Sequence, residues 1–161
     1  MYPKSGSILR AIAGMLAFGL VYVLVDSPVT ARANDTNREL ILASMNGDVE
    51  KVASLLDNGV DVNAKAQRGW TALLWAVSRG QIDVMKLLLE KGADVNVKGD
   101  RGWTPLMEAA NRGNSEAAKL LLKKGADVHL KHEYGWTAIT IARGKDNNAI
   151  AELLKAHGAK K

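Results

Sequence analysis

A short phrase of glycine, tryptophan and threonine returns in this chain at a constant interval of 33 residues. A second phrase, which begins with glycine and has aspartate two residues later, keeps the same interval. Two phrases with one period indicate tandem structural units that bury their apolar faces against one another. The first phrase stands at Gly69–Leu73, Gly102–Leu106 and Gly135–Ile139; the second stands at Gly59–Asn63, Gly92–Asn96, Gly125–His129 and, truncated, Gly158–Ala159.

Each unit is predicted to contain two short helices. In the second unit these are Thr71–Arg79 and Gln81–Lys91, and Gly80 between them lets the chain reverse. Gly92 then ends the second helix, since glycine adopts the left-handed conformation without a steric clash. The predicted core residues of that second helix are Ile82, Val84, Met85, Leu87, Leu88 and Leu89. The four units are predicted at residues 36–64, 65–97, 98–130 and 131–161.

This pattern resembles the ankyrin repeat, whose unit is a β-turn followed by two helices with a Thr-Pro-Leu-His signature. The resemblance covers about Asn37 to Ala159. It implies an all-α ankyrin-repeat solenoid of about four helix-turn-helix units with β-turn or hairpin connections. The residues before it predict an N-terminal signal segment. The threonine is kept at Thr71, Thr104 and Thr137, the proline only at Pro105, and the histidine is replaced by Leu74, Met107 and Thr140.

The two end units depart from the pattern as capping units should. The first unit lacks the glycine–tryptophan turn, yet Leu40 and Ala43 occupy slots that are apolar in the next unit. In the fourth unit Lys155 and Asn148 replace apolar residues, which makes the outer face polar. Asp146 replaces a turn glycine, and a turn is still possible there because aspartate tolerates the left-handed region.

The start of the chain has the layout of a secretory leader. Lys4 and Arg10 precede an apolar run from Ala11 to Val25, and a small-x-small site follows at Ala31–Ala33. A basic start, an apolar run and such a site are the three parts of a signal peptide. Residues 1–33 are therefore predicted to be a signal peptide.

Export to the bacterial periplasm is the predicted destination of the remaining domain, residues 34–161. The alternative is an uncleaved anchor in the inner membrane, formed by residues 8–25. A membrane-spanning helix needs about 20 apolar residues, which favours the cleaved form.

Composition excludes several classes of protein. The chain of 161 residues is 47% hydrophobic and 24% charged, as ordinary globular domains are. It has no cysteine, so disulfides and thiolate chemistry are absent. The net charge of +5 falls to +3 without the leader, which contains three basic residues and one acidic residue. This mild excess is not the basic footprint of a nucleic-acid-binding protein.

No catalytic constellation is recognisable in the sequence. The three histidines are His129, His132 and His157, and none has a serine or a paired carboxylate at a spacing typical of catalysis. His129 and His132 would supply two metal ligands, whereas a site needs three or four. We therefore predict no enzyme activity, no metal and no cofactor, and we interpret His129 as a turn residue.

The residues that vary around the repeated frame form a basic and aromatic set. In ankyrin-repeat proteins the turn tips and the inner face of the first helix usually form the binding surface, so the resemblance implies that role here. Tryptophan and arginine also dominate binding hot spots. The predicted partner-binding residues are Lys65, Arg68, Trp70, Trp75, Arg79, Lys98, Arg101, Trp103, Glu108, Arg112, Lys131, Tyr134 and Trp136.

Several of these residues have a structural alternative. The tryptophans could brace the turns, and exposed lysines and arginines could simply be solvated. Glu108 is unusual at a mostly apolar slot: it could pair with Arg112 four residues later, or it could recognise a donor on a partner.

The sequence thus predicts a non-enzymatic protein–protein interaction module with an acidic or mixed-polarity partner. The alternative is binding to a polyanion or a membrane surface through the lysine row and the terminal Lys160 and Lys161. A membrane partner is expected only if the leader is retained.

Overall fold

The computed structural model describes residues 28–66 and 69–159, and the regular elements in these ranges are helical. The chain divides into two compact units, Met1–Asp35 and Thr36–Lys161, and the second carries the repeats. The helices are α2 Pro28–Asn46, α3 Val49–Asp57, α4 Ala72–Arg79, α5 Ile82–Glu90, α6 Pro105–Arg112, α7 Ser115–Lys123, α8 Ala138–Gly144 and α9 Asn148–Ala156, with a short 3-10 turn, η2, at Asp100–Gly102.

The predicted signal peptide lies largely outside the described residues. Residues 1–27 contain the apolar run and the alternative anchor at residues 8–25. Helix α2 begins at Pro28, so it runs through the predicted cleavage position after Ala33. No helix in the described ranges is long and apolar enough to cross a bilayer. Cleavage, anchoring and export stay predictions.

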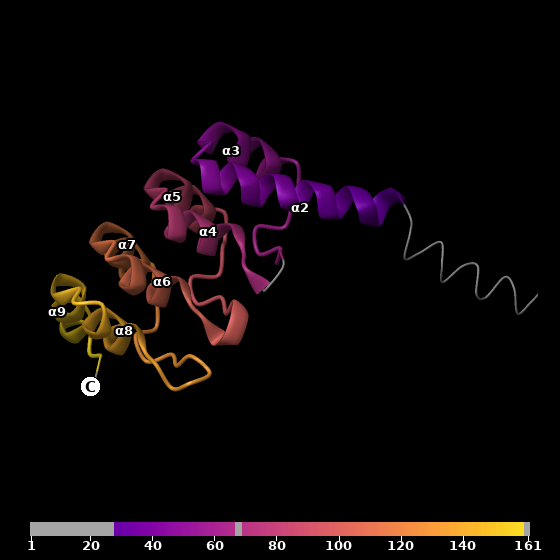
Figure 1. Ribbon diagram of the computed structural model, residues 1–161. Helices are drawn as coiled ribbons and strands as arrows, with labels where there is room; N and C mark the ends of the chain where they lie inside the picture. Colours follow the sequence, from indigo (N-terminus) through magenta and orange to yellow (C-terminus); the bar gives the residue numbers. More distant parts are fainter. Residues whose placement is uncertain (1–27, 67–68, 160–161) are drawn as a thin grey trace, which may run out of the picture. The chain divides into compact units, whose positions relative to one another are not determined.

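Within Thr36–Lys161 the helices pack in pairs that repeat along the chain. Helix α4 packs on α5, α6 on α7, and α8 on α9. Between units, α4, α6 and α8 contact one another in turn, and α3, α5, α7 and α9 form a second row (Figure 1). A continuous hydrophobic core runs through both rows. The predicted all-α solenoid of two-helix units is confirmed.

Threonine begins the first helix of each of the last three units. The hydroxyl of Thr71 accepts a hydrogen bond from Leu74 N–H at 3.4 Å, and Thr104 accepts one from Met107 N–H at 3.3 Å. Such caps satisfy amide groups that have no partner inside the helix, and each contributes about 1 kcal/mol. Leu74 and Met107, which replace the histidine of the family signature, are buried at 0% and 1% exposure. Packing of apolar side chains therefore replaces the histidine in these two units.

The fourth unit fills the same slot with a polar residue. Thr140 Oγ1 accepts a hydrogen bond from Thr137 N–H at 2.9 Å, while Thr137 Oγ1 accepts one from Thr140 N–H at 3.4 Å. This reciprocal pair is a capping box, which satisfies two amides at once. The last unit is thus stabilised locally where the inner units rely on burial.

The turns between paired helices use the left-handed backbone conformation. Gly80 and Gly113 end α4 and α6 with φ of 72° and 70°. Asp146 takes the equivalent place in the fourth unit with φ of 58°, as predicted from its tolerance of that region. Helix α8 already ends at Gly144, so Asp146 lies in the turn and not in a helix.

The second helices bury only part of their circumference. Three of the six core residues predicted on α5 are fully buried, and three are only partly buried and pack against the core. The first three are Val84, Met85 and Leu88, and the others are Ile82, Leu87 and Leu89. The prediction was too broad for the last three, because the contacts of α5 with α3, α4 and α7 leave these side chains partly accessible. Full burial of one such side chain stabilises the fold by about 1.5–3 kcal/mol.

The end units behave as caps. Leu40 and Ala43 are buried at 1% and 7% exposure, which confirms their predicted core slots. Lys155 and Asn148 on α9 are exposed, so the last unit presents a polar outer face. At the C-terminal end of the stack, this polar face replaces the apolar surface on which another unit would pack.

Candidate partner-binding surface

Each of the three turn tips is closed by the same two backbone hydrogen bonds. In the third unit Gly99 N–H donates to Trp103 O at 2.9 Å, and Gly102 N–H donates to Gly99 O at 3.2 Å. The second and fourth units repeat this pattern within Ala66–Trp70 and His132–Trp136. The turn therefore delivers each tryptophan at an equivalent point, directly before the first helix.

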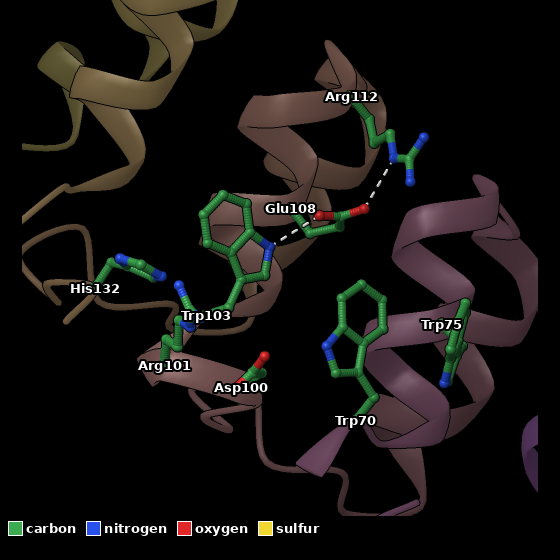
Figure 2. Close-up of a pocket in the computed structure, with 8 residues that line it drawn as sticks. All are labelled: Trp70, Trp75, Asp100, Arg101, Trp103, Glu108, Arg112 and His132. Atoms are coloured by element: carbon green, nitrogen blue, oxygen red, sulfur yellow. Dashed lines mark hydrogen bonds and ion pairs between the residues drawn. The ribbon is translucent and has the colours of Figure 1, made fainter. Parts of the chain in front are cut away.

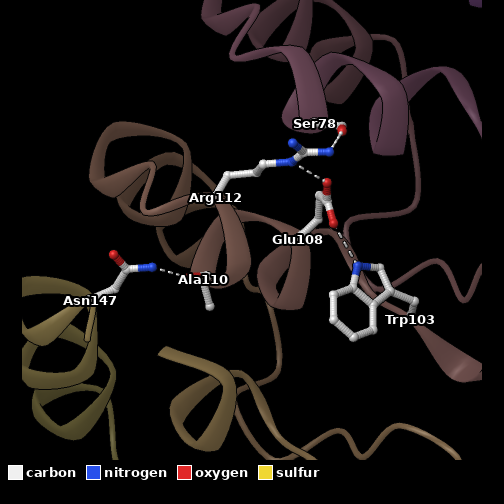
Figure 3. Close-up of polar contacts among 6 residues, drawn as sticks. All are labelled: Ser78, Trp103, Glu108, Ala110, Arg112 and Asn147. Carbon is white, nitrogen blue, oxygen red and sulfur yellow. Dashed lines mark hydrogen bonds and ion pairs between the residues drawn. The ribbon is translucent and has the colours of Figure 1, made fainter. Parts of the chain in front are cut away.

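The tryptophan of the third unit belongs to a polar network (Figure 3). Trp103 Nε1–H donates to Glu108 Oε2 at 2.8 Å. Arg112 Nε–H donates to Glu108 Oε1 at 2.8 Å, and Arg112 also donates to Ser78 Oγ of the preceding unit at 3.0 Å. Glu108 is only 3% exposed, so the network compensates a buried charge.

The predicted ion pair between Glu108 and Arg112 is confirmed. The indole of Trp103 was not expected as its second donor. Both carboxylate oxygens of Glu108 accept a bond from within the chain, and the residue is only 3% exposed, so little of the carboxylate is accessible to a partner. Direct recognition of a partner by Glu108 stays a prediction, and its observed contacts are those of a residue that positions Trp103.

His132 connects the tips of the third and fourth units. Its ring stacks on Trp136 with centroids 5.6 Å apart and 15° between the planes, and it meets Trp103 edge-on at 5.4 Å. Its Nδ1 accepts a hydrogen bond from Tyr134 N–H at 3.3 Å. With 8% exposure, His132 is a buried spacer between two aromatic side chains that are more accessible. Offset and edge-on ring pairs of this kind contribute about 0.5–1.5 kcal/mol each.

Arg101 and Tyr134 join the same two tips on the outside. The Arg101 guanidinium donates to Tyr134 Oη at 3.0 Å and lies 5.7 Å from the ring centroid. Arg101 O accepts a hydrogen bond from Glu133 N–H at 2.8 Å. Arg101 has a positive φ of 53°, which is uncommon for a residue with a side chain and matches its place in a tight turn.

Two hollows of about 350 Å³ and 340 Å³ lie on this surface, and Trp103 lines both. Trp70 lines the first and Trp136 the second, so the three tryptophans border two adjoining hollows. Figure 2 shows the residues of the first hollow around the Trp103 indole. The first is lined by Trp70, Trp75, Asp100, Arg101, Trp103, Glu108, Arg112 and His132, and the second by Trp103, Asn111, Trp136, Thr140, Ile141, Gly144 and Lys145.

The predicted basic residues are placed less uniformly. Lys65, Lys98, Lys131 and Arg79 are exposed, and none of them lines either hollow. Lys65 Nζ donates to Lys98 O at 3.4 Å, so the lysine row follows the tips of neighbouring units. Arg68 lies outside the described residues.

Sequence reasoning missed several residues that line the hollows. Asp100 and His132 line the first hollow, and neither is among the predicted partner-binding residues. Ile141 has the register of Trp75 and Glu108, which are among them, and all three line a hollow. Following that register through every unit would have found it. The role of His132 had no such signal, because the equivalent residues in the earlier tips are small.

Histidine serves structural roles in the described part of the chain. His129 is exposed in a turn, where its N–H donates to Asp127 Oδ1 at 2.8 Å, as a turn residue should. Residues 28–66 and 69–159 contain no cluster of three His, Asp or Glu side chains that could hold a metal ion.

Comparison with known proteins identifies the family. A family model described as ankyrin repeats (3 copies) matches residues 11–99 and 95–161, which together make up most of the chain. Among curated proteins no sequence matches it. The 33-residue period, the threonine-capped first helices and the paired-helix stack agree with the family match. The chain belongs to the ankyrin-repeat family.

Proposed function

We propose that this protein is a non-enzymatic interaction module that binds another protein through its turn tips and first-helix face. Ankyrin repeats are generally protein–protein interaction modules, and the family is typically non-enzymatic. The observation that carries the proposal is the pair of adjoining hollows that share Trp103. A concave site with aromatic walls and a few polar groups is typical of binding surfaces.

Exposed aromatic side chains at the fourth tip support this proposal. Trp136 and Tyr134 are 53% and 59% exposed, so each has a large aromatic surface that a partner could bury. The second hollow is lined by Trp136 together with the apolar Ile141 and the basic Lys145. An apolar partner side chain flanked by an acidic group would fit this combination, because burial and charge pairing would act together.

The charge of the surface favours an acidic or mixed-polarity partner. The exposed lysine row, Lys65, Lys98 and Lys131, adds positive charge along the tips. Such charges raise association rates more than they raise affinity. The buried aromatic contacts would then set the dissociation rate.

We further propose that the domain acts in the bacterial periplasm. The support is the leader pattern of residues 1–33, with its basic start, apolar run and small-x-small site. Retention of residues 8–25 as an anchor would place the same surface at the inner membrane. Intact-mass measurement of the membrane-bound and soluble protein tests this: residues 1–33 present in the membrane fraction would overturn export with cleavage.

Capture from the native envelope fraction tests the binding surface. The full chain is compared with Trp136→Ala and with Leu42→Ala, which removes another exposed apolar side chain (47%) from α2. We expect a partner that is retained by Leu42→Ala and lost by Trp136→Ala. The affinity of that partner should fall about 30-fold or more if Trp136 is an anchor. Identical proteins captured by all three forms would contradict the proposed surface.

Binding to a polyanion or membrane surface is the second candidate, and the exposed lysine row favours it. Salt distinguishes the two. Phosphate binding should weaken steeply and linearly in a plot of log affinity against log salt, whereas an interface anchored by tryptophan should respond less. Lys98→Gln should reduce that slope only if the lysine row contacts phosphate.

A further inference from the structure

The hollow between the second and third units is walled by three tryptophans. Trp70, Trp75 and Trp103 line it together with Asp100, and its volume is about 350 Å³. The Trp70 and Trp75 rings are in contact, with centroids 4.7 Å apart and planes tilted by 51°. In Figure 2, Asp100 lies between Trp70 and Trp103. Three indole rings and the Asp100 carboxylate therefore border the same space.

Four charged side chains line this hollow, and three of them are already engaged. Glu108 is bound to Arg112, and Arg101 donates to Tyr134. The exposed carboxylate of Asp100 makes no hydrogen bond or ion pair with any residue in the described ranges. Asp100 is therefore the anionic side chain of the lining that no described residue engages, while Arg101, whose acceptor is a neutral hydroxyl, keeps its positive charge.

Asp100 and Arg101 both border the hollow. In the view of Figure 2, Arg101 and His132 lie on one side of the Trp103 indole, and Trp70 and Trp75 lie on the other. The Arg101 guanidinium is held by Tyr134 of the next tip, whereas no described residue holds the Asp100 carboxylate.

We propose that this hollow binds a methylated ammonium group, such as the head of choline or the end of a trimethyl-lysine side chain. Aromatic faces attract cations through the ring quadrupole, and tryptophan does so most strongly. A bare ammonium needs hydrogen-bond acceptors that indole faces do not offer, so it would lose hydration without replacement. A methylated ammonium has no such requirement at its methyl groups, and Asp100 supplies the counter-charge.

Trp103 is already held in the orientation that the site needs. Its N–H donates to Glu108, and its ring meets His132 edge-on at 5.4 Å. These two contacts fix the position of the ring in the wall of the hollow. A wall fixed before binding lowers the ordering cost of the complex. The volume of about 350 Å³ also lies in the range of small-ligand pockets, roughly 300–1,000 Å³.

This inference goes beyond the proposed protein-binding function and does not require it. A small cation would occupy the hollow even if no protein partner bound at Trp136. Failure to capture a partner therefore leaves this site untouched, and loss of cation binding leaves the proposed interface untouched.

Calorimetric titration of the full chain tests the proposal. The probes are tetramethylammonium and ammonium chloride at equal ionic strength, and choline beside its neutral isostere 3,3-dimethylbutan-1-ol. We expect each methylated cation to bind about tenfold tighter than its control, since the controls lack either the methyl groups or the charge. Equal affinity for choline and the neutral isostere would overturn the proposal, because the hollow would then be merely apolar.

Variants with matched controls locate the binding. Trp70→Leu should weaken choline binding about five- to thirty-fold, and Asp100→Asn should weaken it about three- to fivefold. The controls are Trp136→Leu, two units after Trp70 in the same register, and Glu133→Gln, one unit after Asp100; both lie outside this hollow and should leave binding unchanged. Thermal unfolding establishes that each variant is folded, and Trp75→Leu replaces Trp70→Leu if the latter is not. If the folded tryptophan variant and the folded Asp100→Asn variant both bind choline as tightly as the wild type, the assignment is overturned.

The source of the group is decided by a third titration, with a short peptide carrying one trimethyl-lysine and its unmodified counterpart. Tighter binding of the methylated peptide than of choline supports a partner's side chain as the occupant. Equal affinity for the two methylated probes supports a free small molecule. Equal binding of methylated and unmodified peptides contradicts the site.

Discussion

The tips of the third and fourth units contain the same glycine–tryptophan–threonine phrase but use it differently. Trp103 is half-buried, and its N–H is bound to Glu108 five residues later. Trp136 is 53% exposed, and the residue five positions later is Ile141. The indole N–H of Trp136 has no acceptor in the described part of the chain. In the second unit the corresponding residue is Trp75, whose ring contacts Trp70.

This comparison shows that the repeated phrase sets the position of an indole and not its role. The role depends on the side chain one and a half helical turns further on, which can bind the N–H, contact the ring, or leave the tryptophan accessible. A tryptophan can therefore brace one tip and be available to a partner at the next. The contacts of Trp103 agree with a bracing role, and contact of Trp136 with a partner stays a prediction.

The largest effect should separate Trp103→Ala from Trp136→Ala. Trp103→Ala is expected to destabilise the protein by about 3 kcal/mol, since it removes a half-buried ring and a donor to buried Glu108. Trp136→Ala should cost less than about 1 kcal/mol, because the ring is mostly accessible. Urea unfolding of both variants measures the difference. Equal losses of stability would show that the two indoles have the same role.

Exchanging the neighbouring residues should come next in size. Glu108→Ile gives the third unit the residue of the fourth, and it should cost about 2 kcal/mol because Trp103 and Arg112 lose their shared acceptor. Ile141→Glu gives Trp136 an acceptor, and Lys145 stands where Arg112 does. The indole N–H of Trp136 should then exchange with solvent more slowly, as measured by NMR. An unchanged exchange rate would refute the claim that this position decides the role.

The inter-helix turns offer a smaller contrast between the same units. Gly113→Ala should destabilise by about 1–2 kcal/mol, since φ is 70° and an added Cβ would lie 2.8 Å from Asn147 Oδ1. The control is Gly144→Ala in the fourth unit, where φ is not left-handed and no atom lies within 4 Å of the added Cβ. The midpoint of thermal unfolding should fall for Gly113→Ala and should not fall for Gly144→Ala. A similar decrease in both would indicate that glycine matters in these turns for another reason.

The smallest effect is expected at the bond between the two tips. Tyr134→Phe removes the acceptor of Arg101 but keeps the ring beneath it. Both residues are exposed, so the loss should be about 0.5 kcal/mol or less. Urea unfolding measures it, with Tyr134→Ala as the comparison that also removes the ring. A loss above 1 kcal/mol would mean that this contact organises the tips.

Much of the architecture could be predicted because it depends on local rules. Helix starts at Thr71, Thr104 and Thr137 follow from threonine capping, and the turn at Asp146 follows from the tolerance of aspartate for positive φ. The number of fully buried residues on α5 was overestimated, because apolar spacing does not reveal how much of a helix its neighbours cover.

The binding surface was predictable only in outline. The register of Trp70, Trp103 and Trp136 placed the right side chains near one another, but the lysines of a parallel register lie outside both hollows. Asp100 and His132 line a hollow without any distinctive spacing. Their contribution depends on which side of the Trp103 ring each one reaches, and spacing along the chain carries no information about that.

The sequence by itself determined the period, the two-helix unit, the caps and the polar ends, since each depends on residues close together in the chain. Tertiary structure decided which tryptophan is bound by a carboxylate, which one stays accessible, and which charges share a hollow. Those outcomes depend on side chains that meet across units, at distances of a few ångströms, where a change of one residue alters hydrogen bonding and burial together. Repetition fixes where the units lie, and the differences between units decide what each can bind.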